Sequence, residues 1–416
     1  MDSSGDDDDQ MATWTPREWR AWMCSLVTGF TLLFVTRSAL PFTIVEMAKE
    51  FDWDKRTSGL ALSAFFWGYS IVQIPSGRLA DRWGGEIVLL YAALASGVTT
   101  LSVPIVARRM EVRGVVLLRF TLGIFQGVFF PALSVLVSNR VVEKRRSLSL
   151  SLPTGSIHVG TVLCGVLASG LVPHYGWASV YYLSGFGTLL WAGLVRMCVF
   201  EKKESRVIRS EKVVLPWRKI LVNKSIIAAQ LAHFCDNSIS AVFYSWLPTY
   251  VNDIFSDKPA WPCNTLTWLA AGISIVLGGT LCDKLIQSGF SFLSARKLTQ
   301  FISNVVPSCF LLLLAFSSLS FLGTVIVMII IVSVQQLHNC GAYTYLSLIN
   351  PEYAGAITGV SNGLSQIPAS LAVSLTGNVL QSTGNDWSII FLAMSGFSLL
   401  GTLIFTTIAT QETAIH

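Results

Sequence analysis

The chain has 416 residues, of which 52% are hydrophobic and 13% are charged, and its mean hydropathy is +0.58. This composition leaves too few polar side chains to cover a soluble protein of this length, so it excludes a soluble globular protein and indicates an integral membrane protein. The formal net charge is only +5, and we expect a lipid bilayer, and no nucleic acid, around the protein.

The first 20 residues are predicted to form a disordered cytoplasmic tail. This segment carries the acidic run Asp6 to Asp9, and it has neither a basic stretch nor a small-residue cleavage site. It therefore differs from a signal peptide, and the first apolar run is expected to remain in the protein as a helix.

Twelve apolar runs follow, separated by polar or turn-rich segments. Runs of roughly 20 apolar residues are long enough for a helix to cross roughly 30 Å of hydrocarbon. We therefore predict an all-α, polytopic membrane protein. The predicted spans are residues 21–47, 58–80, 86–107, 114–138, 147–172, 177–199, 225–251, 265–284, 298–318, 320–347, 353–379 and 387–409.

A short motif occurs twice, each time where an apolar run ends in a charged segment. Gly77-Arg78-Leu79-Ala80-Asp81-Arg82 follows the second span, and Gly279-Thr280-Leu281-Cys282-Asp283-Lys284 follows the eighth. Two unrelated loops would not be expected to share this pattern at equivalent helix ends, so the chain is predicted to consist of two related halves. A membrane protein built from two repeats places a solute site between them and exposes it alternately on each side.

The duplication divides the chain into two pseudo-symmetric six-helix bundles, residues 21–200 and 225–410. Residues 201–224, which are rich in Lys and Arg, form a basic cytoplasmic linker between them, and residues 411–416 form a second tail. Lys and Arg are enriched in cytoplasmic loops, and their distribution places both termini in the cytoplasm.

The repeated motif is interpreted as a pair of gating loops. Gly77 and Gly279 lack a Cβ atom, so a neighbouring helix can pack closely and slide there. Asp81 and Asp283 can bind basic groups or a helix N-terminus, as a latch that breaks when the cytoplasmic face opens. An ordinary solvated loop is the alternative. Arg140 and the run 143–146 supply basic groups on the same side. The predicted gating residues are Gly77, Asp81, Arg82, Arg146, Gly279, Asp283 and Lys284.

Residues 77–85, Gly-Arg-Leu-Ala-Asp-Arg-Trp-Gly-Gly, resemble the signature loop of the major facilitator superfamily. Within that superfamily, residues 119–132 resemble the span-four signature of the solute carrier family 17 organic anion transporters. Other segments are similar to the branch of that family that carries nucleotides into vesicles; they are residues 63–69, 216–218, 245–249, 283–286 and 295–300. The resemblance implies two six-helix bundles with alternating access.

Two arginines, Arg37 and Arg119, lie inside the predicted spans one and four. An arginine near the bilayer centre costs roughly 2.5–3.5 kcal/mol or more, so it normally faces a cavity or a partner. The two spans run in opposite directions and place the two residues at similar depths, where both guanidinium groups can bind one anion. The alternative is that each arginine pairs with an acid or a helix carbonyl.

Gln126 lies two helical turns after Arg119 on roughly the same face. Relatives often carry Glu here, and an amide cannot take up a proton, so proton coupling at this position is disfavoured. The resemblance implies instead that membrane potential drives uptake of nucleotides such as ATP and ADP. Phosphate, sialic acid or another acidic metabolite, with proton or sodium coupling, is the alternative substrate class.

Three further residues are predicted to contact the substrate: Tyr69, Asp236 and His338. Tyr69 and also Tyr244 can stack on a base. Relatives that carry glutamate have Arg where Asp236 is aligned, which argues against a glutamate-type substrate; Asp236 can also pair with an arginine in the empty site. For His158, His233 and His338 a hydrogen-bonded structural role is the stronger alternative.

The sequence has no metal-binding cluster, and no nucleophile with a base such as an enzyme would need. We expect no cofactor; chloride dependence is implied by the family alone. The expected protein is a monomeric transporter in the membrane of secretory vesicles or lysosomes.

Overall fold

The computed structural model describes residues 14–198, 222–258, 260–348 and 354–410, and these ranges contain helices and no strand. Residues 1–13, 411–416 and most of the predicted linker 201–224 lie outside the described residues. The predicted disorder is wrong for residues 16–20, which are helical. Thr15 caps this helix by accepting from the Glu18 amide at 3.3 Å, while the Glu18 carboxylate accepts from the Thr15 amide at 2.7 Å.

The first half contains α2 to α7. Helix α4 comprises two antiparallel segments that turn at Glu111, where φ is 48°, and α5 continues its second segment after Val128. The bounds are α2 Pro16–Phe51, α3 Lys55–Trp83, α4 Gly85–Gly127, α5 Phe129–Arg140, α6 Glu143–Tyr175 and α7 Ala178–Cys198.

The second half contains α9 to α15. The predicted span 320–347 corresponds to the apolar segment Phe321–Leu346, which is long enough to cross a membrane. It is not one continuous α-helix, because α12 ends at Gln335 and a 3₁₀ helix interrupts the segment. Side chains satisfy the backbone at the break: Arg296 donates to the Cys340 carbonyl at 2.7 Å, and the Ala342 amide donates to Gln300 at 2.9 Å. The bounds are α9 Lys224–Ile254, α10 Trp261–Gln287, α11 Phe292–Phe316, α12 Phe321–Gln335, η1 Gln336–Cys340, α13 Ala342–Leu348, α14 Ala354–Thr383 and α15 Trp387–Ile408.

Among the described residues, eight helical segments are long and apolar enough to cross a membrane. One of them, residues 85–140, contains both segments of α4 and also α5, and with 56 residues it is long enough for two crossings. Helices α3, α9 and α14 are not among the eight, since they carry more polar side chains. All three are inner helices, because α14 packs along both α3 and α9.

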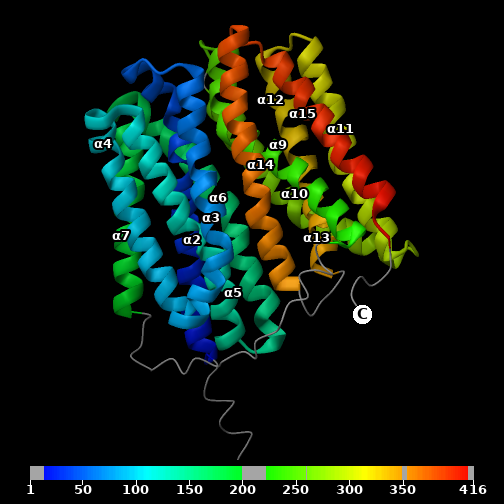
Figure 1. The fold of residues 1–416 in the computed structure, drawn as a ribbon. Helices are drawn as coiled ribbons and strands as arrows, with labels where there is room; N and C mark the ends of the chain where they lie inside the picture. The colour runs from blue at the N-terminus through cyan, green and yellow to red at the C-terminus, as the bar shows by residue number, and fades with distance from the viewer. Residues whose placement is uncertain (1–13, 199–221, 259, 349–353, 411–416) are drawn as a thin grey trace, which may run out of the picture.

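The two halves lie side by side, with α3 next to α14 (Figure 1). Helix α6 packs along α10 in the same way. We call the end of the bundle with the α2–α3 connection the Lys55 end, at the top of Figure 1, and the end with the α3–α4 connection the Gly84 end.

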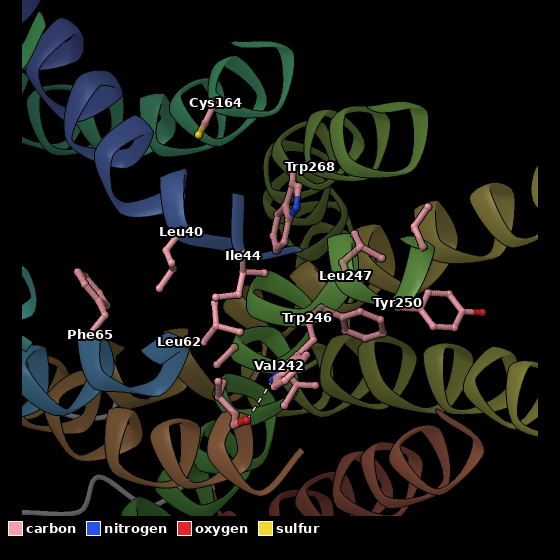
Figure 2. Packing of buried hydrophobic residues seen from close by; sticks show 14 of the residues in the cluster. Leu40, Ile44, Leu62, Phe65, Cys164, Val242, Trp246, Leu247, Tyr250 and Trp268 are labelled. Carbon is pink, nitrogen blue, oxygen red and sulfur yellow. Dashed lines mark hydrogen bonds between the residues drawn. The ribbon is translucent and has the colours of Figure 1, made fainter. Parts of the chain in front are cut away.

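The main hydrophobic core extends across both halves. Figure 2 shows Leu40 and Ile44 of α2 and Leu62 of α3 on the side of the cluster that faces Trp246 of α9. The Trp246 indole donates to the carbonyl of Val373 in α14 at 3.0 Å. Burial of these side chains holds the halves together near the Lys55 end.

The repeated motif is helical, which corrects the prediction that it forms loops. Residues 77–82 lie in the last turns of α3, and residues 279–284 lie inside α10. The chain leaves the helix only at Gly84, whose φ of 87° suits a residue without a Cβ atom. The helix continues past the end of the apolar run as far as Trp83. Ala80, inside the motif, is still packed in the core of the first half.

Candidate substrate site

A small pocket in the first half is lined by residues of α2, α3, α4 and α5. Three of its lining residues, Arg37, Tyr69 and Gln126, are predicted substrate contacts. The other lining side chains are apolar: Phe30, Leu33, Phe34, Phe129 and Phe130. The site thus combines one cation and two neutral polar groups with an apolar wall.

The Arg37 guanidinium is held by aromatic rings. Its Cζ atom lies 4.4 Å from the centre of the Phe65 ring and 5.5 and 5.6 Å from those of Tyr69 and Tyr244. The electron-rich faces of such rings stabilise a cation. Within the described residues, no carboxylate forms an ion pair with Arg37, and its buried Nε atom has no hydrogen-bond partner. The positive charge of Arg37 is therefore not neutralised by any described side chain.

Arg119 lies directly behind Arg37. Its Nη1 atom donates to the Arg37 carbonyl at 3.1 Å, and its Cζ atom lies 5.1 Å from the centre of the same Phe65 ring. Arg119 is only 2% exposed, whereas Arg37 is partly exposed. The structure brings the two predicted arginines together, with Arg37 in the lining and Arg119 as a second charge that also bonds a helix carbonyl.

Gln126 is fixed by two hydrogen bonds to α2. Its Nε2 atom donates to the Leu33 carbonyl at 3.1 Å and to the Thr36 hydroxyl at 2.9 Å. Because both partners accept, the Nε2 donors of Gln126 are used within the protein, and its carbonyl oxygen can accept a hydrogen bond only from a donor group of a ligand. Gln126 therefore places a fixed, uncharged amide in the same pocket lining as Arg37.

Two tyrosine hydroxyls connect the Arg37 surroundings to neighbouring helices. Tyr69 accepts from Asn362 of α14 at 3.4 Å, and the Tyr244 hydroxyl lies 2.7 Å from that of Ser38. Asn362 was not predicted, because nothing in the local sequence distinguishes it from other polar residues of α14. It brings a side chain of the second half to the edge of the site.

Asp236 lies inside the second half and does not line this pocket. It is completely buried, and Gln300 donates to its Oδ2 atom at 2.7 Å. The alternative role suggested for Asp236, pairing with an arginine in the empty site, is not seen here, since no such ion pair occurs in the described part of the chain.

The predicted histidines also lie outside this pocket. His338 bonds the Gln335 carbonyl through Nδ1 at 2.7 Å, and its ring centre lies 6.4 Å from that of His233. The His233 ring is 4.8 Å from that of Tyr343, and His158 lies next to Gly272 of α10.

At the Gly84 end, the motif side chains Asp81, Arg82, Asp283 and Lys284 are exposed. The basic groups expected to bind the motif acids have other partners. Arg140 pairs with Glu86 at 2.9 Å, and Arg146 donates to two backbone carbonyls of the α5–α6 segment, those of Val141 and Ser138. The proposed latch contacts are thus absent from the described residues in this conformation.

At the Lys55 end, an ion pair joins the two halves. The Lys55 ammonium lies 2.7 Å from both carboxylate oxygens of Asp253, and the Lys55 amide donates to Gln381 of α14 at 3.0 Å. Sequence analysis missed this contact, because Lys55 and Asp253 are distant in the chain. A surface cavity of about 440 Å³ lies beside it, lined by residues of both halves.

The described residues contain no group of three or more His, Cys, Asp or Glu side chains that could hold a metal ion. The seven cysteines whose side chains the structure describes are free.

Comparison with known proteins gives a consistent result over most of the chain. Residues 26–373 match the family model described as "Major Facilitator Superfamily". The chain is 32% identical to the human "Voltage-gated purine nucleotide uniporter SLC17A9", over 94% of this chain and 92% of that protein. It is 29% identical to the Arabidopsis thaliana "Ascorbate transporter, chloroplastic", over 94% of this chain and 75% of that protein.

Among solved structures, a bacterial homologue of the human lysosomal transporter Spinster, in an inward-facing and unoccupied conformation, has a similar fold. Its TM-score is 0.74 at 14% identity, and the alignment covers 95% of this chain and 98% of that one.

Proposed function

The chain belongs to the Major Facilitator Superfamily, so it is a membrane transporter and not an enzyme, and from this premise we propose that it carries nucleotides by potential-driven uniport. The substrate class is organic anions, with ATP and ADP as the expected cargo. The similarity to the purine nucleotide uniporter supports this proposal.

One observation carries the proposal: two guanidinium groups lie against the same Phe65 ring, and neither forms an ion pair with a described carboxylate. Keeping two unpaired cations in a protein interior is costly unless an anion completes the site. A guanidinium donates two parallel hydrogen bonds, which fits the oxygens of a phosphate group. We propose that Arg37 contacts the phosphates directly and that Arg119 adds positive potential from behind.

The driving force follows from the charge of the cargo. Moving one elementary charge through 100 mV releases about 2.3 kcal/mol, so a nucleotide with several negative charges is concentrated strongly by an inside-positive vesicle. Gln126 cannot titrate, and the pocket therefore has no proton carrier at this position.

Alternating access requires the two ends to close in turn. We propose that Lys55 and Asp253 close the present structure on the lumenal side, and that Asp81 and Asp283 form contacts when the Gly84 end closes instead. Asp81→Asn is then expected to slow transport without unfolding the protein. The proposed location is the membrane of secretory vesicles or lysosomes, with both termini in the cytoplasm. The proposed working unit is a monomer. Chloride dependence of transport is implied by the family resemblance alone.

The alternative cargo is phosphate, sialic acid or another acidic metabolite, coupled to protons or sodium. The similarity to an ascorbate transporter supports this alternative, so acidic metabolites are included as competitors in the experiment below.

Uptake of labelled ATP by the purified protein in liposomes tests the proposal. An inside-positive potential is imposed, and unlabelled ADP, phosphate, glutamate or sialate is added as a competitor. Competition by ADP alone is the expected result. Strong competition by phosphate or sialate together with weak competition by ADP would favour the alternative cargo.

A further inference from the structure

A carboxylate that forms no ion pair with a described basic side chain lies in the interior of the second half. Asp236 of α9 is 0% exposed, and its Oδ1 atom has no hydrogen-bond partner among the described residues. Three buried basic side chains lie in this part of the second half: His233, Arg296 and His338. His338 is close enough to interact with the carboxylate, but its Nδ1 atom bonds the Gln335 carbonyl at 2.7 Å, and Arg296 of α11 bonds the Cys340 carbonyl. A buried negative charge of this kind is costly without a counter-charge.

Two amide oxygens accompany this carboxylate. The Gln335 Nε2 atom donates to the backbone carbonyl of Asp236 at 3.3 Å, which leaves its Oε1 atom free. Asn304, one turn after Gln300 on α11, has its side chain close enough to interact with the Asp236 carboxylate. Both amides are at most 1% exposed, and neither Oε1 of Gln335 nor Oδ1 of Asn304 has a described partner.

The helix break adds a second source of negative potential. Helix α12 ends at Gln335, and the last carbonyls of a helix carry a partial negative charge. Interrupted helices in secondary transporters use such carbonyl ends to bind coupling cations. The break and the oxygen cluster coincide, because Gln335 belongs to both.

We propose that Asp236, Asn304 and Gln335 form a binding site for one Na⁺ ion. One carboxylate supplies a single negative charge, which a monovalent cation neutralises, and the two amide oxygens complete a set of hard ligands on α9, α11 and α12. A proton on Asp236 would neutralise the charge but leave at least one of the two amide oxygens without a partner. The site is separate from the Arg37 pocket, so this proposal does not depend on which anion is carried.

Thermal unfolding of the purified full-length chain in detergent tests the site without any transport measurement. The melting temperature is compared in NaCl, KCl and choline chloride at equal ionic strength and constant pH. A ligand that binds only the folded state raises the melting temperature in a saturable way. We expect NaCl to raise it by about 3 °C, the order given by a stabilisation of 1 kcal/mol, and KCl to act like choline chloride.

Asp236→Asn keeps the shape of the side chain and removes its charge. This variant is expected to be at least as stable as the wild type in choline chloride and to lose the response to Na⁺. Asn304→Ala is expected to weaken the response at least tenfold in apparent affinity. Asp257→Asn, at an exposed acid in the α9–α10 connection, is the control and should respond like the wild type.

Binding of labelled Na⁺ provides a direct count, and one ion per chain is expected. Equal melting temperatures of the wild type in the three salts would overturn the proposal. So would a Na⁺ response that persists in Asp236→Asn.

Discussion

At the scale of single residues, Arg37 and Arg119 have different proposed roles in binding an anion. Arg37 lines the pocket, while Arg119 is buried behind it and donates to the Arg37 carbonyl at 3.1 Å. The aromatic rings around Arg37 stabilise its charge without neutralising it. The positive potential in the pocket is therefore retained until an anion enters.

Arg37→Lys keeps the charge and removes the planar fork. A hydrogen bond to a charged group contributes about 1.5–3 kcal/mol, so ATP uptake is expected to fall about tenfold or more. Arg108→Lys is the matched control, because Arg108 is an exposed arginine outside the pocket, 3.6 Å from Glu50. Uptake of labelled ATP by both variants gives the comparison, and equal rates would remove Arg37 from the substrate site.

Arg119→Ala separates an anion-binding role from a packing role. We expect uptake to be abolished while the detergent-solubilised protein stays monodisperse and melts within a few degrees of the wild type. Uptake and thermal stability are measured on the same preparation. A folded and fully active Arg119→Ala protein would show that Arg119 only supports the Arg37 carbonyl.

Asp54 caps α3 at the Lys55 end, outside the predicted spans. Hydrogen bonds from the side chain and the amide of Thr57 lower the pKa of Asp54 in the folded protein. The contribution of the cap is thus complete above the unfolded pKa of about 3.9, and it is lost as the pH falls through the lower folded value.

Asp54→Ala is expected to reduce the free energy of unfolding by about 1 kcal/mol at neutral pH. The difference in melting temperature from the wild type should stay constant between about pH 7 and pH 5 and decrease only below about pH 4. A difference that already disappears at the upper end of this range would contradict an ionised cap.

At the scale of elements, α3 and α14 form a seam whose contacts change along its length. A Cβ atom added to Gly377 would lie 2.4 Å from the Lys55 carbonyl, and one on Gly363 would lie 2.9 Å from the Gln73 side chain. Gly77 and Gly359, one turn further toward the Gly84 end on each helix, have no neighbour within 4 Å. The seam is therefore closed at the Lys55 end and open beyond Gln73.

Gly359→Leu tests whether this part of the seam closes during transport. A Cβ atom at this position has no neighbour within 4 Å in the present conformation. The variant should therefore fold with a normal melting temperature, while uptake falls at least tenfold because α3 can no longer approach. Gly396→Leu on α15 is the control, since Gly396 also has no neighbour within 4 Å and α15 does not pack on α3. Normal uptake by Gly359→Leu would contradict closure at this position.

Hydropathy predicted the elements well and their ends less well. The predicted all-α fold with two pseudo-symmetric bundles is confirmed. The predicted ends failed where helix and membrane boundaries differ: α3 continues to Trp83 through polar residues. The break after Gln335 was missed, because the residues that satisfy its backbone, Arg296 and Gln300, lie on another helix.

At the scale of the whole molecule, the site depends on contacts between distant segments. Opposite chain directions were enough to place Arg37 and Arg119 at similar depths, and the structure brings them together. The Lys55–Asp253 ion pair and the Asn362–Tyr69 contact each join the two halves. Neither could be found from the sequence, because a single polar residue near a helix end or on an inner helix does not indicate its partner.

The central claim is that the membrane potential, and not a pH gradient, drives an anion through the Arg37 pocket. Uptake of labelled ATP into liposomes tests it most directly, with an inside-positive potential in one set and a pH gradient at zero potential in the other. We expect uptake to follow the potential and to respond little to the pH gradient, since Gln126 cannot titrate. Strong uptake driven by the pH gradient at zero potential would contradict the account.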